Sequence, residues 1–497
     1  MNKTDIITRT LEILPGALSW GILGSLVLLA LINPVVCAVI VIVFDLYWII
    51  RTVYLTMLLL IARRELFKCK DRDWLRCCQN VREPGRWNTM YHLVVFPVYK
   101  EGPEILTPSL ESIRKSSYPK DRIIVILSFE ERNLAAGRTA KIMEAEFKDS
   151  FGAYLTTFHP AGLPGEAPTK GANATWAAKQ GKQLIEQRAI PCEDVIVSCF
   201  DADTCSEPHY LACVTYHFLT APKPHQASYQ PIPVYNNNVW HAPSFARLVE
   251  ISSSFSQMIE SMRRERFVTF SSHSMSFKTL IDIDYWPVDM ISDDSVIYWK
   301  AYLFYKSDYR VVPLYITVSM DIAYSHNFIQ TILMQYKQKR RWAWGVENFP
   351  YVVSRFLTDR EMPFTRKVRR SYHLLESHVT WAIWAIMVTL MPSLPALFGG
   401  MRFAQIPIGY NLPRVTGTLF QFTFIVSIVW VLLSRTILPP RPADVKWTKN
   451  IVMLLEWFIV PFAILILGST PALDAQTRLM LGKRMKFNVT EKRRKQP

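Results

Sequence analysis

The chain has 497 residues, half of them hydrophobic, and a formal net charge of +16. Its length exceeds that of one ordinary domain, and a mean hydropathy of +0.11 is high for a soluble protein. Much of the Lys and Arg excess flanks apolar segments, as in membrane proteins. No zinc-finger or RNA-binding motif accompanies this excess, so nucleic acid is not expected as a partner. The eight cysteines have spacings that fit neither a zinc site nor a disulfide framework.

Two apolar runs begin the chain. Residues 16–32 carry no charge and end at Asn33-Pro34, and residues 35–61 follow. A helix of about twenty apolar residues crosses a bilayer core, so residues 1–62 are predicted to form a transmembrane hairpin. The basic cluster after Ile61 places the next domain in the cytoplasm by the positive-inside rule.

Short β-branched runs alternate with helix-like segments in the middle of the chain. The runs are residues 92–96, 122–127 and 194–200, and the helix-like segments are residues 109–116, 135–147 and 173–188. This alternation predicts an α/β domain with a mostly parallel sheet over residues 63–325. Ligands bind beyond the carboxyl ends of such strands, where Pro97–Glu101, Ser128–Glu131 and Asp201–Asp203 fall.

The remainder of the chain returns to the membrane pattern. Residues 326–372 are predicted to form amphipathic helices at the membrane interface, residues 373–470 to hold the transmembrane segments 374–397, 418–433 and 451–467, and residues 471–497 to form a basic cytoplasmic tail. Five crossings are apparent, whereas a basic tail inside the cell requires an even number. One apolar segment is therefore re-entrant or interfacial, or one run crosses twice.

Two acidic motifs are candidates for chemistry. Asp201-Ala202-Asp203 follows a strand directly, and two carboxylates at such a turn can reach a divalent cation that also binds phosphate oxygens. The alternative is a solvated acidic loop. Asp293-Asp294 precedes a helix-like segment, which is typical of helix capping. A carboxylate there can also take the proton from an attacking hydroxyl.

Basic and aromatic residues supply further candidates. Lys170 opens a helix after a loop rich in Gly and Pro, where it suits a phosphate or is simply solvated. Glu130 and Glu131 contact a ribose or base, or are surface charge. The pentapeptide Gln338–Trp342 fits a basic amphipathic helix on the membrane. The same helix can present an arginine to a diphosphate and a tryptophan to a sugar ring, so the two interpretations are compatible.

The order of these motifs along the chain, together with the apolar segments at both ends, is similar to that in a known protein family. Val95–Glu101, Lys170–Asn173, Asp201–Asp203, Asp293–Asp294 and the Q-x-x-R-W pentapeptide together resemble the family 2 glycosyltransferases. The resemblance is to the membrane-integrated branch that contains cellulose, chitin and hyaluronan synthases. By motif it covers about residues 90 to 345. The tail segment Phe487–Lys492 also resembles the cytoplasmic F-x-V-T-x-K phrase of these synthases.

The resemblance implies a GT-A fold inserted between transmembrane helices and a nucleotide-diphosphate sugar used with Mg²⁺ or Mn²⁺. It implies that Asp203 is the metal ligand with Asp201 assisting, and that Asp294 is the catalytic base with Asp293 beside it. The residues implied to hold the nucleotide, the leaving group or the acceptor are Pro97, Glu101, Glu130, Glu131, Lys170, Asp201, Gln338, Arg341 and Trp342. Glu130 or Glu131 takes the place of the aspartate that the family has after its second strand.

We therefore expect an integral membrane enzyme, at the plasma membrane, with a cytoplasmic catalytic domain. Its expected reaction is inverting transfer of a sugar, from a UDP-sugar as the expected donor, to a growing polysaccharide. One alternative is a single transfer to a lipid-linked glycan, for which few membrane spans suffice. Another is a non-catalytic membrane scaffold or transporter, although transporters usually carry repeated helical halves.

Overall fold

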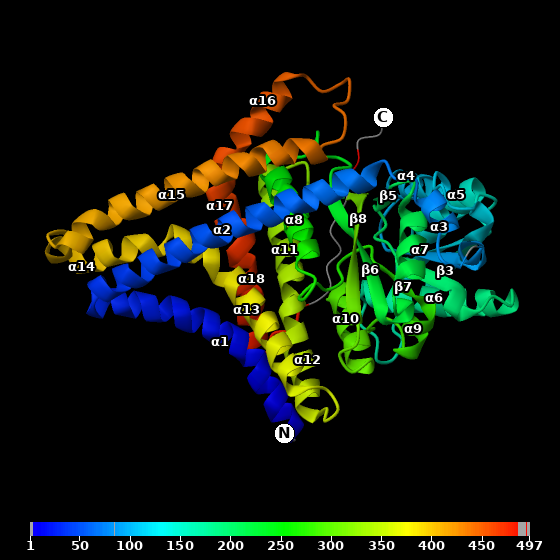
Figure 1. The fold of residues 1–497 in the computed structure, drawn as a ribbon, viewed down its shortest axis with the longest axis horizontal. Coiled ribbons are helices and arrows are strands. Elements are labelled where there is room, and N and C mark those ends of the chain that lie inside the picture. Colours follow the sequence, from blue (N-terminus) through cyan, green and yellow to red (C-terminus); the bar gives the residue numbers. More distant parts are fainter. Residues whose placement is uncertain (1–2, 84, 486–493, 495–497) are drawn as a thin grey trace. The chain divides into compact units, whose positions relative to one another are not determined.

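The computed structural model describes residues 3–83, 85–485 and 494, and these form two compact units (Figure 1). The membrane unit comprises the described parts of Met1–Ile61, Ala242–Ser253 and His326–Met485. The sheet unit comprises those of Ala62–His241, Ser254–Ser325 and Lys486–Pro497. The tail phrase Phe487–Lys492 lies outside the described residues. The domain boundaries and the interfacial role of residues 326–372 stay predictions.

The sheet unit is built around eight strands in the order β3-β2-β1-β4-β7-β6-β8-β5. Three of the strands coincide with the β-branched runs of the sequence, because these runs are buried on both faces of the sheet. The strands are β1 (Tyr91–Val98), β2 (Ile123–Glu130), β3 (Ala153–His159), β4 (Val195–Cys199), β5 (Cys205–Ser206), β6 (Ala227–Tyr235), β7 (Ser274–Ser276) and β8 (Arg310–Met320).

The sheet is mixed, so the expectation of a mostly parallel sheet is not confirmed. Strands β3, β2, β1 and β4 are parallel to one another, and so are β6 and β8; residues 153–159, which form β3, are not among the predicted runs. Strand β7 runs antiparallel to both β4 and β6, and β5 runs antiparallel to β8. These two strands have three and two residues, too few for a period-two pattern to appear in the sequence. Strand β6 contains Pro231, and the register of its pairing with β8 shifts there because proline has no N–H to donate.

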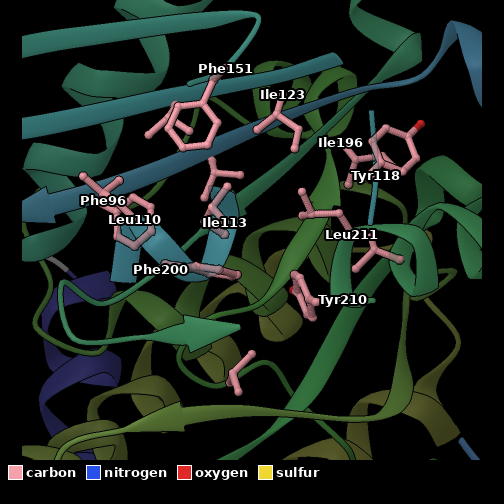
Figure 2. Close-up of a cluster of buried hydrophobic side chains, with 14 of the residues drawn as sticks. Phe96, Leu110, Ile113, Tyr118, Ile123, Phe151, Ile196, Phe200, Tyr210 and Leu211 are labelled. Carbon is pink, nitrogen blue, oxygen red and sulfur yellow. The ribbon is translucent and has the colours of Figure 1, made fainter. Parts of the chain in front are cut away.

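Helices of the sheet unit cover this sheet and enclose its core. They are α3 (Trp74–Gln79), α4 (Pro103–Arg114), α5 (Ala136–Phe147), α6 (Lys170–Gln187), α7 (Tyr210–Thr220), α9 (Phe277–Asp282) and α10 (Asp293–Phe304). Figure 2 shows the cluster of buried side chains that includes Phe96, Leu110, Phe200 and Tyr210. The rings of Phe96 and Phe200 meet edge to face at 5.6 Å. This contact anchors the end of β4 immediately before Asp201.

The membrane unit is helical throughout its regular structure. Its helices are α1 (Lys3–Ile32), the first part of α2 (Pro34–Lys70), the first part of α8 (Ser244–Met262), α11 (Phe328–Ala343), α12 (Asn348–Thr358), α13 (Phe364–Thr389), α14 (Leu394–Ala404), α15 (Pro407–Ser434), α16 (Thr448–Leu455), α17 (Val460–Ile464) and α18 (Thr470–Met480). Polar contacts join them across the unit: Ser19 donates to Gln476 over 2.7 Å, and Arg51 pairs with Glu376 at 3.1 Å.

Within the described residues, four helical stretches are long and apolar enough to cross a membrane. They are Asp5–Ile32, Pro34–Lys70, Pro407–Ile437 and Thr448–Met480. A fifth crossing results if α13 and the segment Met391–Ala404, bent by 44° to each other, count as one span. The bend falls at Pro392, whose ring cannot continue the helix of the preceding residues. The expected even number of crossings stays a prediction.

Candidate active site

Lys170 lies between two of the predicted acidic motifs in the sheet unit. Its Nζ is 2.7 Å from Asp201 Oδ1 and 2.9 Å from Asp294 Oδ1. Asp201 follows β4, Lys170 is the first residue of α6, and Asp294 lies in the first turn of α10. Three motifs that are far apart in the sequence therefore meet at one ammonium group.

Local backbone features bring α6 to this position. Thr169 caps the helix, its side chain accepting the N–H of Ala172. The next residue after Lys170 is Gly171, and a Cβ there would meet the carbonyl oxygen of Pro287 and lie 2.9 Å from Asp293 Cβ. The absence of a side chain at Gly171 thus lets the start of α6 approach the start of α10.

Two hydroxyl groups support the acidic residues from the segment between α8 and β7. Ser271 Oγ donates to Asp201 Oδ2 over 2.7 Å, and Thr269 Oγ1 donates to the carbonyl oxygen of Asp294 over 2.6 Å. Asp293 is buried beside them. Sequence reasoning missed Ser271 and Thr269, because no local pattern marks a serine or threonine as a partner of a residue seventy or twenty-five positions away. Asp293 and Asp294 also lie in the first turn of α10, where the helix dipole favours acids, whereas the N-cap position is occupied by Ser292.

The protonated form of Lys170 is stabilised by its neighbours. Burial disfavours the ammonium, but the carboxylates of Asp201 and Asp294 outweigh burial and raise the pKa of Lys170 well above its ordinary value. The buried ring of His273 lies near the same groups, and burial lowers its pKa, so this histidine is neutral. The cluster therefore carries a permanent cation between two carboxylates.

Asp203 lies deeper in the sheet unit than Asp201. Its side chain is fully buried, and its Oδ2 accepts the backbone N–H of Asp321 over 2.8 Å. Asn237 Nδ2 donates to its carbonyl oxygen over 3.0 Å. Asp321 follows β8 and is buried too, and burial together with the neighbouring Asp203 raises the pKa of Asp321 to about 6. Sequence reasoning missed Asp321, which stands in no recognised motif.

The residues expected to hold Mg²⁺ or Mn²⁺ do not form an open pair of ligands in this arrangement. The oxygens of Asp201 contact Lys170 and Ser271, and Asp203 is buried against Asp321. Among the residues that the structure describes, no three His, Cys, Asp or Glu side chains are placed to hold a metal ion.

The predicted nucleotide-binding residues lie at the carboxyl ends of β1 and β2. Pro97 is within β1, and Glu101 follows it, with Oε2 accepting the N–H groups of Tyr99 at 2.9 Å and Lys100 at 3.1 Å. Glu131 Oε2 accepts the N–H of Ala161 at 3.3 Å. Glu101 thus orders the turn in which it lies, and Glu131 joins the end of β2 to the loop that follows β3.

Glu130 is buried at the end of β2 and belongs to an ionic chain. Its carboxylate is 3.0 Å from Arg132 Nε and 3.4 Å from Nδ1 of His159, whose Nε2 is 2.8 Å from Glu166. Burial opposes the charged ring, but Glu130 and Glu166 outweigh it and raise the pKa of His159. His159 ends β3, and sequence reasoning missed it because a strand-end histidine carries no distinctive pattern.

The pentapeptide Gln338–Trp342 lies on α11 in the membrane unit. Gln338 is buried, and Arg341 and Trp342 are half-buried. Lys339 Nζ is 2.8 Å from Glu250 Oε2 and 3.6 Å from the centre of the Trp342 ring. Arg340 pairs with Asp474 at 2.8 Å. The charges of Lys339 and Arg340 are therefore matched by acids of the same unit.

Comparison with known proteins gives structural neighbours only. No protein-family model matches the chain, and no curated protein matches it. Among solved structures, a mannosyltransferase from Pyrobaculum calidifontis, in complex with GDP-Man and Mn²⁺, is 14% identical with a TM-score of 0.40, over 82% of this chain and 99% of that one. TarS residues 1–349 from S. aureus, in complex with UDP-GlcNAc, are 14% identical with a TM-score of 0.39, over 81% of this chain and 95% of that one. These structural neighbours are glycosyltransferases of low sequence identity.

Proposed function

We propose that this protein is a membrane-bound glycosyltransferase that uses a nucleotide-diphosphate sugar. The observation that supports it best is the meeting of Lys170, Asp201 and Asp294. The resemblance assigns these residues to the nucleotide, the diphosphate and the catalytic base. These residues come from three separate chain segments, and they meet beyond the carboxyl end of β4. A shared role in binding the donor accounts for this meeting.

In the proposed reaction Asp294 is the general base. Its carboxylate takes the proton of an acceptor hydroxyl while the acceptor oxygen attacks the anomeric carbon of the donor. The new C–O bond forms as the bond to the diphosphate oxygen breaks, and the nucleoside diphosphate leaves with the bonding electron pair. Attack opposite the leaving group inverts the configuration at that carbon.

Lys170 has two roles in this proposal. Its ammonium group pairs with the carboxylates of Asp201 and Asp294 and holds them close together. When a diphosphate is present, the same ammonium offsets the negative charge that develops on the leaving group. A diphosphate that draws Lys170 toward itself would release Asp294, so that the base becomes available with the donor in place.

The wider proposal follows the resemblance. The donor is a UDP-sugar, the acceptor is a growing polysaccharide, and the sheet unit is cytoplasmic. Gln338, Arg341 and Trp342 serve the acceptor and the leaving group. Mg²⁺ or Mn²⁺ stays a prediction, and it is tested by comparing transfer with either ion against transfer in EDTA.

The proposal is tested on the full chain in lipid nanodiscs with a panel of radiolabelled UDP- and GDP-sugars. We expect one donor to give labelled product, and Asp294→Asn to reduce transfer by about 100-fold or more, within the range for loss of a positioned base. Asp308→Asn is the matched control, since Asp308 is an exposed aspartate that pairs with Lys223 at the surface. Full activity of Asp294→Asn, or loss that is equal in Asp308→Asn, would refute the assignment.

Product length separates polymer extension from the alternative of a single transfer to a lipid-linked glycan. Chain extension predicts long products whose length falls in Trp342→Ala. A single labelled sugar on lipid, of unchanged size in that variant, favours the alternative. The absence of hydrolysis or transfer with every donor favours a non-catalytic scaffold or transporter.

A further inference from the structure

Arg494, near the C-terminus, contacts the acidic turn of the sheet unit. Its Nε donates to both carboxylate oxygens of Asp321, at 3.0 and 3.1 Å, and its Nη2 lies 2.9 Å from Asp321 Oδ1. The same Nη2 donates to the carbonyl oxygen of Asp203 over 3.0 Å. The planar guanidinium thus holds a side chain and a backbone group at once, a geometry that a lysine cannot reproduce.

This contact is buried and forms a closed set of interactions. The Asp321 residue is 2% exposed, and the side chain of Arg494 is 13% exposed. Asp321 in turn donates its backbone N–H to Asp203 Oδ2. Arg494, Asp321 and Asp203 therefore each contact the other two, and the arginine supplies the positive charge that lets two neighbouring carboxylates remain buried side by side.

We propose that Arg494 is a positioning residue that fixes the Asp201–Asp203 turn for donor binding. The inference rests on the proposed function, because it takes this turn as part of the diphosphate site. Arg494 itself touches no reacting atom. It acts through Asp321 and the Asp203 backbone, and it makes donor binding depend on a residue almost three hundred positions away in the chain.

The first test measures donor and acceptor kinetics of the full chain in nanodiscs. Arg494→Ala should raise the donor KM by about tenfold, in the range reported for partners that orient ligand-binding residues, with the acceptor KM unchanged. Arg494→Lys should lie between Arg494→Ala and the wild type. Arg484→Ala is the matched control, because Arg484 is an exposed arginine ten positions before Arg494 in the chain.

A double variant separates positioning from folding. Arg494→Ala leaves the Asp321 carboxylate buried without its cation, so Tm should fall. Adding Asp321→Asn removes that charge and should restore Tm while the donor KM stays raised, since the contact with Asp203 is still missing. Recovery of the donor KM together with Tm would show a purely structural role and overturn the proposal. An unchanged donor KM in Arg494→Ala, or a gain of activity in it, would overturn the proposal as well.

Hydrogen exchange tests the contact without any enzymatic activity. Arg494→Ala should speed amide exchange in residues 201–206 and 319–323, and Arg484→Ala should leave both segments unchanged. If the wild-type chain transfers no sugar, the proposed function fails while the exchange measurement still decides whether Arg494 orders the turn. Equal exchange in Arg494→Ala and the wild type would overturn the inference whatever the activity.

Discussion

Replacing Lys170 with methionine removes the positive charge between Asp201 and Asp294. The side chain of Lys170 is 12% exposed, and those of the two aspartates are 24% and 26% exposed. Removing one partner of a fully buried pair costs about 3–5 kcal/mol, whereas an exposed pair is worth about 0.2–1 kcal/mol. Because both carboxylates keep some contact with water, we expect Lys170→Met to lose about 2–3 kcal/mol of unfolding free energy.

This loss is measured as a shift of Tm for the full chain in nanodiscs. For a unit of this size about 1 kcal/mol corresponds to about 2–4 °C, so the expected decrease is about 4–12 °C. Because the folded-state pKa of Lys170 is raised above 10.5, the stabilisation is complete below that pH and is lost only as pH rises through the raised value. The decrease in Tm should therefore be the same throughout the neutral range.

Two further variants decide whether the effect is electrostatic. Lys182→Met on the same helix breaks a surface pair with Glu186, separated by 3.5 Å, and should cost no more than about 0.5 kcal/mol. Adding Asp294→Asn to Lys170→Met removes one uncompensated carboxylate and should recover part of the lost Tm. A Tm for Lys170→Met equal to that of Lys182→Met, or no recovery in the double variant, would refute the reasoning.

Three other predictions concern packing, pH and the pentapeptide. Gly171→Ala forces a Cβ against Pro287 and Asp293 and should lower the free energy of unfolding, measured by denaturant titration, by about 1–3 kcal/mol. Gly137 has open space around it, so the control variant Gly137→Ala should be neutral or slightly stabilising. The pKa of His159 is raised by Glu130 and Glu166, so the protonated ring should stabilise the fold below about pH 6.5. This stabilisation should be lost as pH rises through the raised pKa. Over that range Tm should fall in the wild type and stay constant in His159→Gln. Lys339→Met removes the ammonium that pairs with the buried Glu250 carboxylate and should cost about 3–5 kcal/mol, and adding Glu250→Met should recover most of it, as judged by Tm.

The parts of the fold that follow local patterns could be predicted from the sequence. The runs around Val94, Val125 and Val197 form β1, β2 and β4, because an unbroken β-branched run has one stable place, in the buried centre of a sheet. The apolar runs of the termini likewise form long helices. The mixed half of the sheet was not predictable, since β7 consists of Ser274–Ser276 and its place depends on pairing with β4 and β6.

The candidate site divides in the same way. Lys170, Asp201 and Asp294 could be named because each stands in a recognisable motif. Ser271 and Asp321 could not, because hydrogen bonds to residues 70 and 118 positions away follow from the tertiary fold alone. The family resemblance assigns roles to the motif residues, but it does not identify the side chains that hold those residues in place.

The two ring faces of Trp342, the residue proposed to stack on an acceptor sugar, are not equivalent. The Lys339 ammonium lies 3.6 Å from the ring centre, and Glu250 holds that ammonium in place. One face of the indole is therefore covered by an ammonium group that also pairs with the buried carboxylate of Glu250. Under the proposed function, a sugar that stacks on Trp342 therefore binds to the face opposite the Lys339 ammonium. The lysine in the second position of the pentapeptide would then determine the side from which the proposed acceptor reaches the ring.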